Sequence, residues 1–199
     1  MKTLYIILGV LLAVFVIIQL IGMNSQRGIE KYPYKVIKEY NKFEIRKYEA
    51  SLFTSVKLST GKYESGSSNG FSILAGYIFG GNDKNQKIAM TSPVAMSMED
   101  SMEVMFLVPK EYKKEDLPTP NQSEIQFKEV PEKTMASITF GGWADSEKIE
   151  KYKLKLIKLL EEKEIAHSAK FYFHGYNAPY EVVNRKNEIL VELEGKVFP

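Results

Sequence analysis

Few side chains in this sequence could carry out bond-breaking chemistry. Its 199 residues include no cysteine and only two histidines, His167 and His174. The lack of cysteine excludes disulfides, iron–sulfur clusters and thiol nucleophiles, and two histidines cannot build a multi-histidine metal centre. The sequence also has no Ser–His–Asp order, metal motif or phosphate-binding glycine loop. It therefore predicts a ligand-binding protein and not an enzyme.

The methionines are concentrated in one segment, with five of the eight between Met90 and Met105. If Lys87–Met98 is one unbroken strand, its period-two alternation puts Met90, Met96 and Met98 on one face with Ile88 and Val94. Three interpretations stay open. The face belongs to the core, it contributes Met96 and Met98 to a pocket for flat apolar ligands, or its thioethers bind copper(I).

His174 is the one histidine placed to act as a metal ligand. In Phe171–Tyr176 it points to the face opposite Phe171 and Phe173, where it could ligate iron from a cleft wall. The alternative is a strand histidine that faces solvent or is hydrogen-bonded. His167 follows a predicted helix in a polar stretch, and we expect it to be exposed.

The overall charge is nearly balanced, with 27 Lys+Arg against 25 Asp+Glu and a formal net charge of +2. Without a basic excess to neutralise phosphates, the sequence predicts no nucleic-acid partner. Apolar residues make up 44% and charged residues 26%, as in ordinary globular proteins.

The N-terminal segment Leu4–Met23 is uncharged and mostly apolar. As a helix it would span about 30 Å, the thickness of the hydrocarbon core of a bilayer. It lacks an Ala-x-Ala cleavage site, which favours an uncleaved transmembrane anchor over a signal peptide or a core helix. We therefore divide the chain into an anchor (1–23), a linker (24–31) and a binding domain (32–199), and the lipid bilayer is an expected partner.

The membrane side of the domain follows less directly from the charges. Lys2 precedes the apolar run, and Arg27, Lys31, Lys35 and Lys38 follow it. Counted literally, the positive-inside rule favours a cytoplasmic domain. A short positive segment before a long apolar run is, however, typical of exported proteins. We favour a single-pass membrane protein with an extracytoplasmic domain and leave the side open.

Two segments have helical spacing of apolar residues and the rest of the domain reads mostly as strand. The predicted helices are Ser67–Phe79 and a helix capped by Asp145 that runs to about Lys163. The predicted strands are Tyr34–Tyr40, Phe43–Tyr48, Ser51–Leu58, Lys87–Met98, Glu103–Pro109, Glu124–Val130, Thr134–Phe140, Lys170–Tyr176 and Glu188–Leu193.

Shifting the sequence by 86 residues superimposes similar elements in the same order. Leu74 then falls on Leu160, Pro93 on Pro179, and strand on strand. This pattern indicates an internal duplication. It predicts an α+β fold, a pseudo-twofold antiparallel β-barrel with one helix from each half packed on it, and a cleft between helix and sheet.

Several motifs, in the same order along the chain, resemble the SOUL/haem-binding-protein family. They are Phe43–Tyr48 (FEIRKY), Tyr77–Asn82 (YIFGGN), Lys87–Val94 (KIAMTSPV), Gly175–Pro179 (GYNAP) and Asn184–Ile189 (NRKNEI). The resemblance covers about residues 32–194. It implies a duplicated barrel with two helices that binds haem or other tetrapyrroles non-covalently as a carrier, buffer or scavenger. The fold is also similar to GyrI-like effector-binding domains, and a general binder of hydrophobic or cationic small molecules is the alternative function.

The family cleft and the parity of the methionine strand together predict the binding residues. They are Leu74, Tyr77 and Ile78 of the first helix, with Met96 and Met98 opposite. The position of a proposed axial histidine after the E-I-R motif is Lys47 here. We therefore expect any bound iron to be weakly or water-ligated, with His174 as the candidate metal ligand. Arg185 and Glu188 of the last motif are expected to pair or to fix the final turn.

Overall fold

The computed structural model describes residues 2–25, 28–59, 63–98 and 101–195. An N-terminal helix, α1 (Lys2–Ser25), leads into a domain with two further helices, α2 (Tyr63–Ile78) and α3 (Ser146–Glu161), and a short 3-10 helix at Lys114–Asp116. The strands are β1 (Glu30–Lys31), β2 (Tyr34–Glu39), β3 (Glu44–Tyr48), β4 (Ser51–Leu58), β5 (Thr91–Ser92), β6 (Val94–Met98), β7 (Met102–Leu107), β8 (Gln126–Val130), β9 (Lys133–Gly141), β10 (His167–Gly175) and β11 (Lys186–Leu193).

The predicted cap of α3 is confirmed, and the predicted long strand Lys87–Met98 is wrong. The Asp145 carboxylate accepts a hydrogen bond from the Lys148 backbone N–H at 2.7 Å. Residues 87–90 are not in a strand, and a cis Ser92–Pro93 peptide bond separates β5 from β6. Proline has no N–H for a ladder hydrogen bond, so the strand is interrupted at Pro93.

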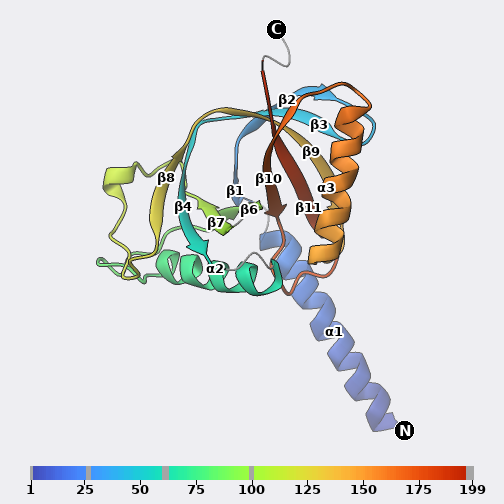
Figure 1. The fold of residues 1–199 in the computed structure, drawn as a ribbon. Coiled ribbons are helices and arrows are strands. Elements are labelled where there is room, and N and C mark those ends of the chain that lie inside the picture. The colour runs from blue at the N-terminus through green and yellow to red at the C-terminus, as the bar shows by residue number, and fades with distance from the viewer. Residues whose placement is uncertain (1, 26–27, 60–62, 99–100, 196–199) are drawn as a thin grey trace.

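Nine strands form one antiparallel sheet in the order β2-β3-β9-β11-β10-β6-β7-β4-β8, and β1 pairs separately and in parallel with β5. The sheet curls strongly but its edge strands β2 and β8 do not pair, so the predicted barrel is an open half-barrel (Figure 1). The α+β class with two helices packed on a curled antiparallel sheet is confirmed.

The order of elements repeats across the middle of the sheet. β3-β4-α2-β6-β7 corresponds to β8-β9-α3-β10-β11, and the two hairpins β6-β7 and β10-β11 meet where β6 pairs with β10. The first strand of each repeat pairs with the other repeat, β3 with β9 and β8 with β4. This exchange joins the two repeats into a single sheet.

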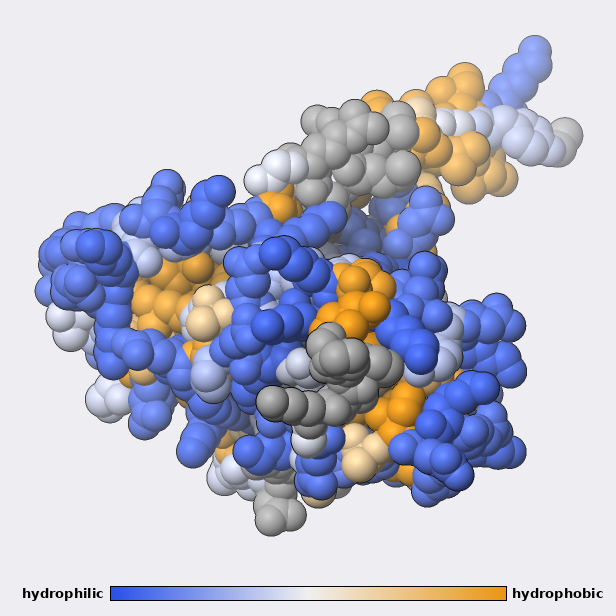
Figure 2. All heavy atoms as spheres, turned by 90° about the horizontal axis from the view of Figure 1, so that it is seen from above, coloured by the Kyte–Doolittle hydropathy of each residue, from blue (hydrophilic) through white to orange (hydrophobic). Residues whose placement is uncertain are grey.

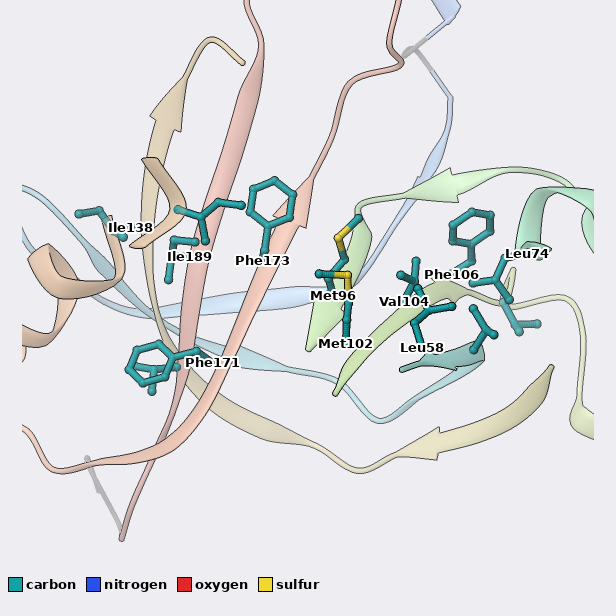
Figure 3. Packing of buried hydrophobic residues seen from close by; sticks show 14 of the residues in the cluster. Leu58, Leu74, Met96, Met102, Val104, Phe106, Ile138, Phe171, Phe173 and Ile189 are labelled. Carbon is teal, nitrogen blue, oxygen red and sulfur yellow. The ribbon is translucent and has the colours of Figure 1, made fainter. Parts of the chain in front are cut away.

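Both helices pack on the same face of the sheet and build the main hydrophobic core there. Leu74 of α2 and Leu160 of α3, which superimpose in the sequence repeat, are both fully buried. In Figure 3, Met96 and Met102 lie between a group around Leu74 and Val104 and a group around Phe173. The methionines thus fill the junction between the two halves, which suits their flexible side chains.

Helix α1 extends away from the domain. Its window Lys2–Gln19 has a mean hydropathy of 2.3 and is long and apolar enough to cross a membrane, which a signal sequence would also be. Its apolar side chains from Leu4 to Ile18 are exposed, and Figure 2 shows this helix leaving a mostly hydrophilic body. Within the described residues, this apolar helix contacts the rest of the chain only near the C-terminal end of α1.

Candidate functional site

The side of the sheet that α2 and α3 leave uncovered carries charged and polar side chains among aromatic rings, and we call it the helix-free face. Strand alternation separates the two sides. On β10, Phe171 and Phe173 join the main core, whereas Tyr172 and His174 point to the helix-free face. Tyr32, which follows β1, packs over this face against Tyr48 and Phe53, with ring centroids 4.7 and 5.0 Å away.

His174 is buried on the helix-free face, with 2% of its surface exposed. Its ring lies 6.4 Å from that of Tyr32 and 6.2 Å from that of Tyr48. Among the described residues no group forms a hydrogen bond with its Nδ1. Burial lowers the pKa of His174 to about 4, because the charged imidazolium loses its hydration there. The expectation of a solvent-facing histidine is therefore wrong, and the imidazole is neutral at pH 7 with its Nδ1 unpartnered.

A buried ion pair stands next to this histidine. Arg46 of β3 donates two hydrogen bonds of 3.0 Å to the carboxylate of Glu188 on β11, and the Tyr176 hydroxyl donates to the same carboxylate at 2.5 Å. Burial alone would raise the pKa of Glu188, but the hydrogen bonds and charge of Arg46, with Lys186 nearby, outweigh it and lower the pKa to about 2.

The partner of Glu188 corrects the expected pairing with Arg185. The Arg185 guanidinium instead donates to the backbone carbonyls of Ala178 and Glu181 and stacks on the Trp143 ring at 3.9 Å. Arg185 does fix the turn before β11, as the alternative expectation stated.

Two further ion pairs line the helix-free face. Lys133 pairs with Glu192, which also accepts a hydrogen bond from the Tyr172 hydroxyl at 2.5 Å. Lys128 pairs with Glu103 at 2.5 Å. The glutamates that turn to this face from β7 and β11 thus each have a cationic partner.

A pocket opens between Tyr32 and the sheet, and His174 lies in its wall. Its cavity volume is about 40 Å³, room for a few water molecules. Aromatic rings, thioethers and two ammonium groups surround it, from Tyr32, Phe53, Tyr172, Met105, Met135, Lys128 and Lys133. Burial, with the nearby charge of Glu192, raises the pKa of Tyr32 to about 12, so its hydroxyl stays protonated.

The residues predicted to bind the ligand lie on the opposite side of the sheet. Leu74, Tyr77, Ile78 and Met96 belong to the main core and are at most 5% exposed. Tyr77 also donates a hydrogen bond to the Pro118 carbonyl at 2.9 Å. The side chain of Met98 lies outside the described residues. The structure thus brings four of the five together as core, away from His174, and their role in binding stays a prediction.

The described residues contain no group of three or more His, Cys, Asp or Glu side chains that could hold a metal ion. His167 is half-buried, with its ring against that of Phe171 at 5.8 Å, and not exposed as expected.

The sequence reasoning missed the role of the tyrosines and of Arg46. A signal was present in the alternation of Tyr172 and His174 on β10, continued by Tyr176 just after it, and of Arg46 and Tyr48 on β3. That alternation marks a polar aromatic face, but nothing local indicates that the two strands share it.

The fold is shared with a solved structure, the C-terminal domain of EcmrR. That structure matches with a TM-score of 0.61 at 13% identity, over 81% of this chain and 98% of that one. This likeness shows the shared fold.

Sequence comparison identifies the family. The SOUL heme-binding protein family matches residues 29–192, and the chain belongs to it. It is 30% identical to Heme-binding protein 2 of Homo sapiens over 156 residues, covering 74% of this chain and 76% of that protein. It is 28% identical to Heme-binding protein 2 of Mus musculus over 168 residues, covering 80% and 82%. The predicted resemblance is confirmed.

Proposed function

We propose that this protein is a membrane-tethered binder of haem or another tetrapyrrole that serves as a carrier, buffer or scavenger and catalyses no reaction. Its relatives are named for haem binding, which supports the ligand class. The observation that carries the proposal is the pocket on the helix-free face, with aromatic and thioether walls and the unpartnered nitrogen of His174. When bound, haem would supply an iron that accepts an axial ligand.

The chemistry of this pocket fits a tetrapyrrole. Rings such as those of Tyr32 and Phe53 and the thioethers of Met105 and Met135 suit a flat apolar macrocycle. The ammonium groups of the two lysines carry the charge that suits its carboxylates, although each is already paired with a glutamate. The free space is too small for a whole macrocycle, so entry requires Tyr32 to move, and Tyr32 follows a strand of only two residues.

Affinity would come mainly from burial of the macrocycle. At about 25 cal/mol per Å², covering several hundred Å² contributes on the order of 10 kcal/mol before entropic costs. The apolar site predicted from the sequence, Leu74, Tyr77, Ile78, Met96 and Met98, is the competing location on the other side of the sheet.

Filling the pocket distinguishes the two locations. Ala95 lines the pocket, and Ala95→Leu adds apolar volume there without a charge. We expect it to weaken haem binding to the full-length protein in mild detergent by at least about tenfold. Exposed Ala50, changed to Leu, is the matched control and should bind normally. Unchanged affinity in a folded Ala95→Leu protein would favour the helix side.

A second titration asks what part of the ligand is recognised. We expect ferric haem, ferrous haem and metal-free protoporphyrin to bind within about tenfold of one another, since burial dominates. A selective loss of haem affinity in His174→Leu would identify His174 as an axial ligand. Tighter binding of a cationic dye than of any tetrapyrrole would instead support the general small-molecule binder, although Glu188 and Glu192 are already paired with cations.

We further propose that α1 is an uncleaved anchor with the domain on the extracytoplasmic side. The contacts of its C-terminal end with the domain support retention of the helix, since a cleaved segment has no need of them. Full-length protein should stay in the membrane fraction through carbonate washing. A processed, soluble chain beginning near Asn24 would show a signal peptide.

A further inference from the structure

The C-terminal end of α1 is docked on the loop between β10 and β11. Gln19 is the polar side chain that interrupts the apolar helix, and it is 9% exposed. Its amide nitrogen donates to the Tyr180 carbonyl at 2.9 Å, and its amide oxygen accepts from the Val182 N–H at 3.0 Å. An amide next to a hydrocarbon environment is costly unless both of its ends are satisfied, and this loop satisfies both.

A close approach one turn further on holds the helix at the same place. A Cβ added at Gly22 would lie 3.0 Å from the Glu181 Cγ and 3.3 Å from the Tyr180 ring. A Cβ here is tighter than ordinary contact, so any larger residue requires the Glu181 and Tyr180 side chains to shift, and a branched one requires more. Two contacts, at Gln19 and Gly22, therefore fix the orientation of the helix relative to the domain.

Exposed apolar and aromatic side chains surround the point where α1 leaves the domain. Tyr180 is 53% exposed, Val182 42%, Val183 46% and Trp143 53%. Arg185 joins them, because it stacks on Trp143 and donates to the carbonyls of Ala178 and Glu181 in the docked loop. We call Trp143, Tyr180, Val182 and Val183 the collar.

The composition and place of the collar fit one environment, the interface between a bilayer and water. Tryptophan and tyrosine concentrate at this interface, where the ring is in an apolar region and the polar atom reaches water. Tyr180 of the collar lies against α1 at Gly22, and in Figure 1 β2 lies at the opposite end of the domain from that helix.

We propose that the collar lies in the headgroup region of the bilayer that α1 crosses, so that the domain is held against the lipid in one orientation. This inference rests on the proposed membrane anchor. It differs from a flexible tether, which would leave the collar in water and the domain free to rotate.

Trp143 is the single tryptophan of the chain and reports directly on the collar. Full-length protein in lipid nanodiscs, made with or without lipids brominated near the headgroup, provides the measurement. We expect the brominated lipid to reduce Trp143 emission relative to the unbrominated lipid, because a ring at the interface lies next to the bromine atoms. The matched control is Trp143→Phe with Val36→Trp, which moves the tryptophan to β2, where Val36 is 50% exposed, and should show no quenching.

The same samples separate failure of the collar from failure of the anchor. Protein that dissociates from the nanodiscs would refute the anchor. Protein that stays in the nanodiscs with Trp143 unquenched, or with quenching equal to that of the Val36→Trp control, would refute the collar and leave the anchor standing.

The docking itself is tested by two glycines of the same helix. Gly22→Val should push the loop away and lower the quenching of Trp143, whereas Gly9→Val should change nothing, because no atom lies within 4 Å of a Cβ at Gly9. Gln19→Leu should act like Gly22→Val by removing both hydrogen bonds. Full quenching in Gly22→Val and Gln19→Leu would overturn the role of docking in orienting the collar.

Discussion

Replacing His174 by leucine should remove most of the loss of stability that the protein suffers between pH 7 and pH 4.5. Burial lowers the pKa of His174 from 6.5 to about 4 in the folded protein. Below pH 6.5 the unfolded chain therefore binds a proton that the folded protein does not, and the free energy of unfolding falls with pH. With these two pKa values, linkage gives a loss of about 2.5 kcal/mol at pH 4.5, which levels off below pH 4.

The window above pH 4.5 isolates the histidine, because the lowered pKa of Glu188 acts only below its unfolded value of 4.5. Urea unfolding of the full-length protein in mild detergent, followed by Trp143 emission, gives the free energies at pH 7 and pH 4.5. His174→Leu should also be at least as stable as the wild type at pH 7, since it removes the unpartnered Nδ1.

His167→Leu is the control, because it changes the other histidine and leaves His174 in place. It should retain the full dependence on pH. If His174→Leu loses as much stability as the wild type between pH 7 and pH 4.5, the buried neutral imidazole is not the cause and the reasoning fails.

Three further changes probe the framework of the domain. Arg46→Met should destabilise the fold by about 3–5 kcal/mol, because it leaves the Glu188 carboxylate buried without its main partner. The double variant Arg46→Met/Glu188→Leu should regain most of the lost stability, measured by thermal unfolding. Acid titration by circular dichroism should show a second loss of folded signal as pH falls from 4.5 to about 2, where the folded Glu188 takes up its proton. Glu188→Gln should reduce this step to the contribution of carboxylates such as Glu192, whose pKa is lowered, against the effect of burial, by hydrogen bonds from Lys133 and Tyr172. A step of unchanged size would refute the role of Glu188. Leu160→Ala should cost about 2–5 kcal/mol of unfolding free energy, while Leu154→Ala on the exposed side of the same helix should change it by less than about 0.5 kcal/mol.

The sequence alone determined the elements, the duplication and the family. Helices and strands produce apolar periods of 3.6 and 2 within one short segment, so α2, α3 and most strands could be predicted. Leu74 and Leu160 coincide in the repeat because each anchors its helix to its own half of the sheet. The strand predicted at Lys87–Met98 failed because the apolar pattern continues through Pro93 although the ladder does not.

The tertiary structure decided which residues meet, and with it the candidate site. Arg46 and Glu188 are 142 residues apart, and they pair because β9 lies between β3 and β11 in the sheet. His174 is buried because Tyr32 and Tyr48, from distant segments, cover it. Gln19 finds its partners 161 and 163 residues away in the loop after β10. Alternation along a strand tells which side chains share a face, but strand order and the segment that covers that face depend on contacts between parts of the chain far apart in sequence, which no local pattern encodes.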